Sequence, residues 1–472
     1  MHINTKITNS KTAFLNKSVI YQLFLRAFTQ DGTFNSASKM LAYLRELGVD
    51  ILYLCPCFSA DDDENQEYWS PRQKLANTNN PKNPYRIKDY YSIDEEYGTE
   101  EDFANFIEKA HDYGFRVILD LVYFHCGPKA VFIDTHSDFV VRDEKGNIET
   151  GVWLFPKLNY ESSELREYLW KNMCYYVEKF GIDGYRCDVG DAVPLDFWEE
   201  GRRRLEKIKP DIFMLNEGGN PASLKNAFDI NYDFEWPEVL FNSMMSGRIH
   251  SCNDEKTKAE KEYTAKSVPE YWNKCVKRYS DEGADTCAVV RFTDNHDYAN
   301  DAYDNRKDAI APPNVMTAML AFCILLDGVP FIYNGVEIRD RARHSIFSGA
   351  NYGRFCIDWS EALTDEGKKR FESVKRLLDI RHRYEEISEG ETYWLKVSDE
   401  KSMCAFERRL GNYSTVVYAN FTEKSLNAEI ECGNALKIER LFINDSDCIY
   451  DKGILKCSIL PYGCGAVRIK RD

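Results

Sequence analysis

The sequence predicts an α/β fold: a (β/α)8 TIM barrel with a small insertion after its third strand and a C-terminal antiparallel β-sandwich domain. Short apolar runs alternate with amphipathic helical segments along most of the 472 residues. The alternation is interrupted once, after the third apolar run, and it stops after about Gly390. The chain is also too long for one compact domain, which suggests two or three.

Eight apolar, strand-like runs are spaced along the first part of the chain. They are Val19–Leu25, Asp50–Pro56, Arg116–Val122, Asp183–Val189, Asp211–Glu217, Ala227–Phe234, Ala288–Thr293 and Val329–Asn334. Most are apolar nearly throughout, which is typical of parallel strands buried on both faces. Segments predicted to be helical lie between them, such as Ala37–Leu47, Glu101–Tyr113, Ser163–Phe180 and Pro313–Leu326. An open, doubly wound sheet would also alternate, but eight strands over this length favour a closed barrel.

The two departures from the alternation give the predicted domain boundaries. Residues 126–160 contain a hairpin-like turn, DEKGN, and several short polar stretches, so we expect an inserted subdomain there. The barrel then comprises residues 1–125 and 161–388. Residues 389–472 are predicted to form the C-terminal domain, because short strand-like segments separated by Gly, Asn and Asp turns are typical of antiparallel sheets. These segments are Met403–Arg408, Ser414–Ala419, Asn427–Glu431 and Ala466–Ile469.

Composition narrows the classes of function. The chain carries 61 Lys and Arg against 77 Asp and Glu, and this net charge of −16 argues against nucleic-acid and anionic-membrane binding. The N-terminal stretch MHINTKITNSKTAFLNK lacks the apolar run of a signal peptide, and no segment approaches the length of a membrane span. We therefore expect a cytoplasmic protein, whose oligomeric state the sequence does not indicate.

The cysteines do not indicate a disulfide framework. They number 15, an odd count, and show no repeated spacing. Several, such as Cys55, Cys287 and Cys323, lie inside apolar strand-like runs, so reduced thiols in the core are favoured. Cys55 and Cys57 flank a single proline and lack a second cysteine pair, which argues against a zinc or redox motif.

Polar residues gather where the predicted strands end. Active sites of barrels of this kind form at the C-terminal ends of the strands. Five of these ends read DLVYFH, GYRCDV, LNE, FTDNHD and IYNGVE. They offer Asp120, His125, Arg186, Asp188, Glu217, Asp294, His296, Asp297 and Glu337. Carboxylates, an arginine and two histidines are thus predicted to converge on one rim.

This set of side chains suits the cleavage of a glycosidic bond. The reaction needs one carboxylate as nucleophile and one protonated carboxyl group that donates to the leaving oxygen. A further anion favours an oxocarbenium-like transition state, and a nearby arginine keeps the nucleophile ionised. Histidines can hydrogen-bond sugar hydroxyls, and some of the 27 Phe, 29 Tyr and 8 Trp can offer flat faces to sugar rings.

Each of these residues also has a structural interpretation. A charged residue at a strand end is often only solvated or ion-paired, and this applies to Asp188 when it is considered alone. His125 alone is more typical of a structural histidine, and Asp294 and Glu337 are expected to be structural. The placement of several such residues at successive strand ends is what favours catalysis. A metal-dependent barrel enzyme is disfavoured, because the chain has only 8 His and no cluster with ligand spacing.

The strand-end motifs together resemble the α-amylase family, family 13 of the glycoside hydrolases. The resemblance covers nearly the whole chain and rests on motifs in the family's order. Besides the ends quoted above, they are GVDILYLCP from Gly48, NPYRIKDYYSIDEEYGT from Asn83, FPKLNY from Phe155 and GVPFIYNGVE from Gly328. The resemblance implies the barrel, a domain inserted after the third strand and a C-terminal β-sandwich.

The resemblance also implies roles for the polar residues of the motifs. Asp188 would form a covalent glycosyl-enzyme, and Glu217 would act as general acid and then as base. Asp297 would bind hydroxyls of the distorted sugar at the cleavage point, and Arg186 would position Asp188.

Three further residues would bind the same sugar. His125 and His296 would hydrogen-bond it, and Tyr85 would stack on it. The double displacement would retain the configuration at the anomeric carbon.

Departures from the family pattern concern metal binding and linkage. Phe124 stands where the third-strand motif usually has the Asn that ligates a calcium ion, and Ala192 stands where a His often contributes to that site. The first loop, TQDGTFN from Thr29, is too poor in carboxylates for a second metal motif, and the acidic run Asp61–Glu64 is expected to be a solvated loop. We therefore expect no cofactor and no metal at the usual site.

Arg86 replaces the Asp that often follows the stacking tyrosine in enzymes that trim α-1,6-linked ends, which argues against a close match to that group.

The sequence therefore predicts a retaining hydrolase of α-glucosidic bonds, mainly α-1,4, in maltodextrins or related α-glucans. A transglycosylase or isomerase of the same family, acting on sucrose, trehalose or maltose, is the alternative, because the chemistry is shared until the glycosyl-enzyme forms. A binding protein that retains only the barrel is disfavoured, since all three carboxylates are present. Endo or exo action is left open.

Overall fold

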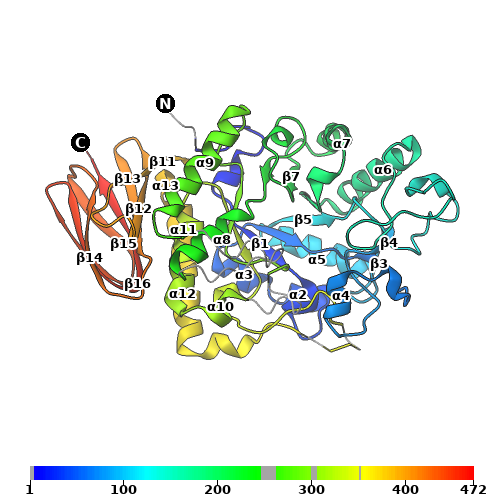
Figure 1. The fold of residues 1–472 in the computed structure, drawn as a ribbon, viewed down its shortest axis with the longest axis horizontal. Helices are drawn as coiled ribbons and strands as arrows, with labels where there is room; N and C mark the ends of the chain where they lie inside the picture. Colours follow the sequence, from blue (N-terminus) through cyan, green and yellow to red (C-terminus); the bar gives the residue numbers. More distant parts are fainter. Residues whose placement is uncertain (1–4, 246–261, 299–305, 350–351, 354, 472) are drawn as a thin grey trace.

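The computed structural model describes residues 5–245, 262–298, 306–349, 352–353 and 355–471, and its centre is a parallel barrel (Figure 1). The barrel strands are β1 (Ile20–Leu23), β2 (Ile51–Leu54), β5 (Arg116–Leu121), β6 (Gly184–Cys187), β7 (Phe213–Asn216), β8 (Ile230–Asn231), β9 (Val290–Phe292) and β10 (Val329–Tyr333). Each falls inside one of the eight predicted runs. Nearly all of their side chains are buried, as the apolar runs predicted.

The strands follow one another around the barrel in the order β8-β7-β6-β5-β2-β1-β10-β9, and every neighbouring pair is parallel. β1 pairs on both sides, with Ile20 opposite Ile51 of β2 and Phe331 of β10. A parallel bridge between Asn231 and Val289 joins β8 to the start of β9 and closes the ring. The predicted (β/α)8 barrel is confirmed, and the open doubly wound sheet is excluded.

Helices surround the barrel on its outside (Figure 1). They are α1 (Leu25–Phe28), α2 (Phe34–Ser38), α3 (Leu41–Leu47), α4 (Pro71–Leu75), α5 (Glu100–Asp112), α6 (Ser163–Phe180), α7 (Leu195–Ile208), α8 (Glu235–Met244), α9 (Ser267–Asp281), α10 (Lys307–Ile310), α11 (Pro313–Leu325), α12 (Asp365–Arg383) and α13 (Glu385–Glu389). The predicted helix Ala37–Leu47 is two helices. Capped by Thr33, α2 begins three residues before the predicted start, and the chain turns at Lys39 before α3 begins.

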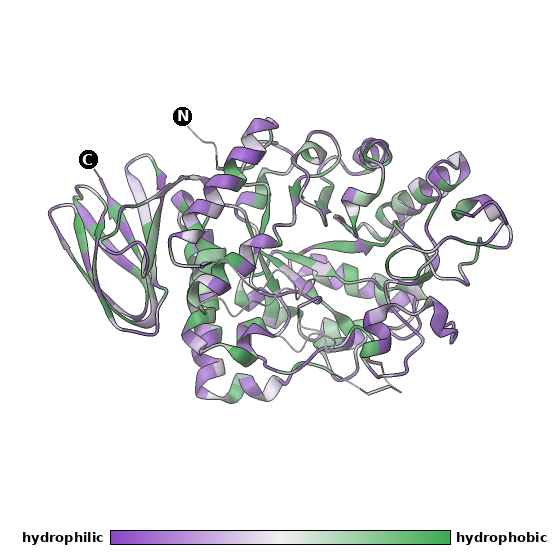
Figure 2. Cartoon of the chain, viewed as in Figure 1, coloured by the Kyte–Doolittle hydropathy of each residue, from purple (hydrophilic) through white to green (hydrophobic). Residues whose placement is uncertain are grey.

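The helix α11 is apolar around its whole circumference because it is buried on all sides. It lies between the barrel and the C-terminal sheet, and its Phe322 makes edge-to-face contacts with Phe406 and Phe421. Figure 2 shows apolar residues concentrated on the central strands, whereas the outer helices carry hydrophilic residues. None of the helices in the described part of the chain is both long and apolar enough to cross a membrane.

The C-terminal domain is built from six antiparallel strands in one hydrogen-bonded sheet that curls on itself. They are β11 (Glu391–Trp394), β12 (Met403–Leu410), β13 (Tyr413–Asn420), β14 (Leu426–Glu431), β15 (Lys437–Asp451) and β16 (Ile454–Lys470). The long strand β16 pairs with β14 through its first half and with β13 through its second half. The two halves enclose a common core of side chains that includes Met403, Ile430, Leu455 and Val467, which gives the sandwich-like packing expected from the sequence.

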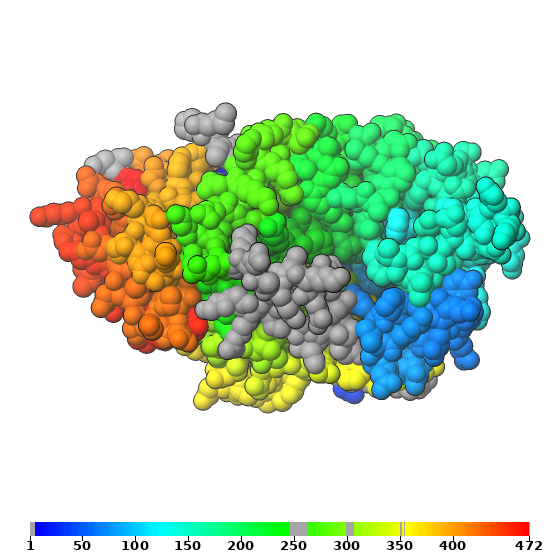
Figure 3. Space-filling model, viewed as in Figure 1, coloured from blue at the N-terminus to red at the C-terminus, as the bar shows by residue number. Residues whose placement is uncertain are grey.

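Two loops extend the barrel at the end opposite the C-terminal domain. The loop after β2 contains a small antiparallel sheet of β3 (Phe58–Ala60) and β4 (Ile87–Ile93), which the sequence analysis did not predict. The predicted insertion, residues 126–160, contains isolated bridges and a tight turn between Asp143 and Asn147. Figure 3 shows these two regions, blue and cyan, side by side. The exact domain boundaries remain a prediction.

Candidate active site

The barrel brings the predicted site residues together at the C-terminal ends of its strands. Arg186 lies in β6, Asp188 follows it directly, Glu217 follows β7 and Asp297 follows β9. A cleft of about 570 Å³ opens above them, and Asp188, Glu217 and Asp297 contribute to its lining. Tyr85, His125 and His296 line the same cleft. All seven residues that the sequence singled out therefore meet at one site.

Arg186 is the centre of the polar floor beneath the cleft. Its guanidinium is fully buried and contacts three carboxylates. Nη1 donates to Asp120 at 2.6 Å and to Asp188 at 2.7 Å, and Nη2 forms an ion pair with Glu217 at 2.6 Å. Both predicted catalytic carboxylates thus contact one cation, which keeps them close together.

The pKa values of these two carboxyl groups depend mainly on their burial. Burial raises the pKa of Asp188, and the neighbouring charge of Glu217 raises it further, while Arg186 opposes both effects. Burial also raises the pKa of Glu217. Two acidic groups held this closely favour a state in which they share one proton, which is the state that a nucleophile and a general acid require.

The backbone between the two carboxylates contributes a hydrogen bond. Val189 adopts a left-handed conformation with φ of 45°, which is unusual for a β-branched residue. Its N–H donates to Oε2 of Glu217 at 2.8 Å. Strained backbone of this kind is often found where a functional group is held in place. Nothing in the sequence indicated this contact.

Asp297 lies in a different electrostatic environment. Burial would raise its pKa, but the charges of His296 and Arg72 and a hydrogen bond from Arg72 hold the pKa well below its usual range. Burial lowers the pKa of His296, and the negative charge of Asp297 opposes that effect. Nη1 of Arg72 donates to Oδ1 of Asp297 at 2.7 Å.

Tyr85 and His296 form one rigid unit. Their rings stack with centroids 5.3 Å apart and planes inclined by 10°. The Tyr85 hydroxyl donates to Asp120 at 3.0 Å and lies 2.7 Å from Nε2 of His296. Gln22 of β1 contacts the other ring nitrogen of His296, with the Gln22 Nε2 2.6 Å from the His296 Nδ1. This network fixes both rings before a substrate arrives.

His125 faces the cleft with one ring nitrogen without a hydrogen-bond partner. Its Nε2 lies 2.9 Å from the carbonyl oxygen of Tyr85, which makes Nε2 the protonated nitrogen of a neutral ring. Burial lowers the pKa of His125 to about 4, so the ring is neutral near pH 7. The buried Nδ1 makes no hydrogen bond and can accept one from a ligand hydroxyl. The rings of Trp153 and Phe155 enclose the same histidine.

Several contributors were not found by sequence reasoning. Arg72 lies on the short helix α4 within the loop after β2, and the stretch SPRQKL carries no recognisable signal. Gln22 lies inside an apolar strand, where its polarity was the only available signal. Trp153 lies two residues before the FPKLNY motif, and this position next to a motif was the signal that could have marked it as a cleft residue.

Three other acidic positions do not line this cleft. Glu337 accepts hydrogen bonds from the hydroxyls of Tyr21 and Tyr43, and Asp294 forms an ion pair with Lys307, consistent with structural roles. The expectation that Asp61 belongs to a solvated loop is wrong. Its side chain is fully buried because it pairs with the buried guanidinium of Arg86 at 3.5 Å.

The described residues contain no group of three or more His, Cys, Asp or Glu side chains placed to hold a metal ion. Phe124 and Ala192, which replace the expected calcium ligands, offer no ligand atoms in their side chains. We therefore expect that 5 mM EDTA leaves the melting temperature of the protein unchanged in differential scanning calorimetry, with an added Ca²⁺ sample as control. A clear drop with EDTA that Ca²⁺ reverses would contradict this expectation.

Comparison with known proteins identifies the family. A family model described as "Alpha amylase, catalytic domain" matches residues 8–148 and 148–388. The chain belongs to the α-amylase family. The family predicted from the motifs is thereby confirmed, and the matched residues end where the barrel ends and the C-terminal sheet begins.

Relatives of this α-amylase-family chain are about 25% identical to it over the aligned residues. A cyclomaltodextrinase of Geobacillus thermopakistaniensis is 25% identical over 80% of this chain and 60% of its own length, and an intracellular maltogenic amylase of Bacillus subtilis gives the same figures. The chain thus spans about 60% of the length of these relatives. A crystal structure of a maltogenic α-amylase from Thermotoga neapolitana superposes with a TM-score of 0.73 and 23% identity, covering 97% of both chains, and shows the shared fold.

Proposed function

We propose that this α-amylase-family protein is a retaining glycoside hydrolase that cleaves α-glucosidic bonds, mainly α-1,4, in maltodextrins or related α-glucans. The observation that carries the proposal is the arrangement of Asp188 and Glu217 on one buried guanidinium at the floor of the cleft. Retaining enzymes need their two carboxyl groups only about 5 Å apart, and a shared arginine supports such a spacing.

In the first step Asp188 attacks the anomeric carbon and Glu217 gives its proton to the glycosidic oxygen. The bond between that carbon and oxygen breaks, the shortened glucan leaves as an alcohol, and a covalent glycosyl-enzyme forms on Asp188. Burial raises the pKa of both carboxyl groups and Arg186 opposes this effect on each, so the pair can hold a proton, and the mechanism requires that proton to lie on Glu217. The pKa of Asp297 lies well below its usual range, so its carboxylate is ionised and stabilises positive charge on the sugar ring.

In the second step Glu217, now ionised, removes a proton from water. The water oxygen attacks the anomeric carbon, the ester bond to Asp188 breaks, and the sugar leaves with its original α configuration. We propose that Tyr85, His125 and His296 hold the same sugar throughout. The stacked ring of Tyr85 and the unpartnered Nδ1 of His125 support this assignment.

The substrate class is supported by the lining of the cleft and by the relatives. Trp153, Phe155 and Phe234 bring aromatic faces to the cleft, which suits uncharged sugars. The names of the relatives refer to cyclomaltodextrins and to maltogenic action. We propose a cytoplasmic location, which is supported by the intracellular relative at 25% identity and by cysteines that are free throughout the described residues.

Product analysis by NMR tests the proposal. Maltoheptaose, sucrose and trehalose are incubated separately with the enzyme. Early release of shorter products in the α configuration from maltoheptaose supports the hydrolase. If maltoheptaose is unchanged while sucrose or trehalose is rearranged, the same carboxylates serve a transglycosylase or isomerase, and the hydrolase proposal is wrong.

A further inference from the structure

The side of the cleft opposite Glu217 is built by three loops that belong to consecutive strands. Because the barrel strands follow the order β8-β7-β6-β5-β2-β1-β10-β9, β1 lies across the barrel from β7. Glu217 follows β7, whereas Arg26 lies in α1, the short helix that comes after β1. The loop after β2 and the loop after β10 lie on either side of Arg26. Whether this side of the cleft is open or closed decides whether a glucan chain can extend past the cleavage point in that direction.

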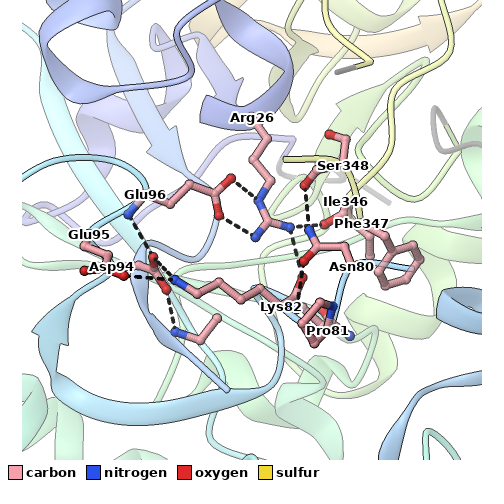
Figure 4. A network of polar contacts seen from close by, with 12 residues as sticks. Arg26, Asn80, Pro81, Lys82, Asp94, Glu95, Glu96, Ile346, Phe347 and Ser348 are labelled. Carbon is pink, nitrogen blue, oxygen red and sulfur yellow. Dashed lines mark hydrogen bonds and ion pairs between the residues drawn. The ribbon is translucent and has the colours of Figure 1, made fainter. Parts of the chain in front are cut away.

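Arg26 joins the two flanking loops to each other. Its Nη1 donates to the carbonyl oxygen of Ile346, in the loop after β10, at 2.5 Å and to that of Lys82, in the loop after β2, at 3.3 Å. Its Nε and Nη2 bind the carboxylate of Glu96 at 2.9 and 2.7 Å, which fixes the guanidinium plane (Figure 4). The Arg26 side chain is only 2% exposed. A buried, two-pronged ion pair of this kind holds its partners rigidly.

A second contact closes the seam between the loops. Nδ2 of Asn80 donates to the carbonyl oxygen of Ser348 at 3.1 Å (Figure 4). Nε2 of Gln73 donates to the carbonyl oxygen of Asn80 at 2.9 Å. Asn80 is 2% exposed and Ser348 is fully buried. Solvent therefore does not pass between the two loops at this point.

The seam directly adjoins the substrate cleft. Arg72 and Asn83 from the loop after β2 line the cleft, as do Ile346 and Phe347 from the loop after β10. Arg72 also binds Asp297, so the wall and the cleavage point are in direct contact. On the other side, next to Glu217, the lining includes Phe234, which is 37% exposed.

We infer that the joined loops close the non-reducing end of the cleft, so that the enzyme acts on free chain ends and not on interior bonds. This inference rests on the proposed function. The general acid must lie beside the leaving group, so the part of the glucan on the reducing side of the scissile bond lies toward Glu217. The part on the non-reducing side points to the opposite wall, where Arg26, Glu96 and Asn80 hold the loops together. Linear α-glucans with an unmodified terminal glucosyl unit are the substrate class that fits, and cyclic dextrins do not.

Blocked and cyclic substrates test the inference. The wild-type protein is incubated with maltoheptaose labelled at its reducing end, with the same compound carrying a 4,6-O-ethylidene group on its terminal glucose, and with β-cyclodextrin, and products are sized by mass spectrometry. We expect kcat/KM for the blocked and cyclic substrates to be at least about 100-fold lower than for the free chain. Comparable cleavage of all three would overturn the inference and leave the proposed function intact. Cleavage of none would overturn the proposed function itself.

An Arg26→Met variant tests whether the seam causes this selectivity. We expect the ratio of kcat/KM between the free and the blocked substrate to fall about 10-fold, because the loops can then separate. The ratio is informative even if overall activity falls, since a general structural loss affects both substrates alike. Arg45→Met, which removes an arginine that is 49% exposed, is the matched control. If the ratio of kcat/KM between the free and the blocked substrate is unchanged in a folded Arg26→Met protein, the Arg26 contacts do not close the non-reducing end of the cleft.

Discussion

Replacing Asp188 with Ala is expected to lower kcat with maltoheptaose by at least about 10⁴-fold while the protein stays folded. The loss follows because Asp188 is the proposed nucleophile. The fold is expected to persist because Asp188 lies at the cleft floor outside the strand, and Arg186 keeps Asp120 and Glu217 as partners. Activity is measured by chain-length analysis, and folding by the melting temperature, which should change by only a few degrees.

Added azide distinguishes this role from a merely structural one. Azide can enter the space that the carboxylate leaves and attack the anomeric carbon from that same face, so Asp188→Ala with azide should yield a β-configured glycosyl azide. Asp196→Ala, at an exposed acidic position on α7, is the control and should keep wild-type activity. Near-wild-type activity of Asp188→Ala without azide would refute the assignment.

Replacing Glu217 with Gln is expected to lower kcat/KM on maltoheptaose by about 10²- to 10⁴-fold. The effect should be much smaller on α-glucosyl fluoride, because fluoride leaves without a proton from the enzyme. The pH profile should change as well. Burial raises the pKa of Glu217, so the active acid form persists above the usual carboxyl range and is lost as the pH rises through the raised pKa. The glutamine cannot titrate, so this alkaline limb should disappear.

The control for this variant is Glu270→Gln at an exposed position of α9, which should leave both the rate and the pH profile unchanged. Azide with a Glu217→Ala variant gives a second readout. It should attack the glycosyl-enzyme from the face opposite Asp188 and give an α-configured azide. Equal losses on maltoheptaose and on the fluoride would contradict a role for Glu217 as general acid.

Local patterns were sufficient to find the barrel strands and the strand-end residues that meet at the candidate site, whereas Tyr85 was singled out only through the resemblance to the α-amylase family. A strand buried on both faces has to be apolar throughout, so eight such runs were visible in the sequence. Residues at strand ends, such as Asp188 and Glu217, are placed by the barrel geometry alone, which is why their convergence could be predicted. Helix ends were less certain, because the cap at Thr33 and the turn at Lys39 depend on single residues.

Loop-borne contributors could not be predicted in the same way. Arg72 reaches Asp297 only because the loop after β2 folds back over the barrel, and nothing periodic marks such a loop. Asp61 was expected in solvent, but its charge is compensated by Arg86, a residue 25 positions away in sequence. Long-range ion pairs leave no local pattern, so the burial of an acidic residue cannot be inferred from its neighbours alone.

The sequence by itself determined the family, the barrel and the identity of the candidate catalytic groups, because these depend on hydrophobic period and on residues fixed to strand ends. The tertiary structure decided the pKa values of those groups and which end of the cleft is closed. The pKa shifts of Asp188, Glu217 and Asp297 arise from burial and from charges brought together from distant segments. The seam between the loops after β2 and β10 is formed by the buried Arg26 and by Asn80, whose partners lie far away in the sequence.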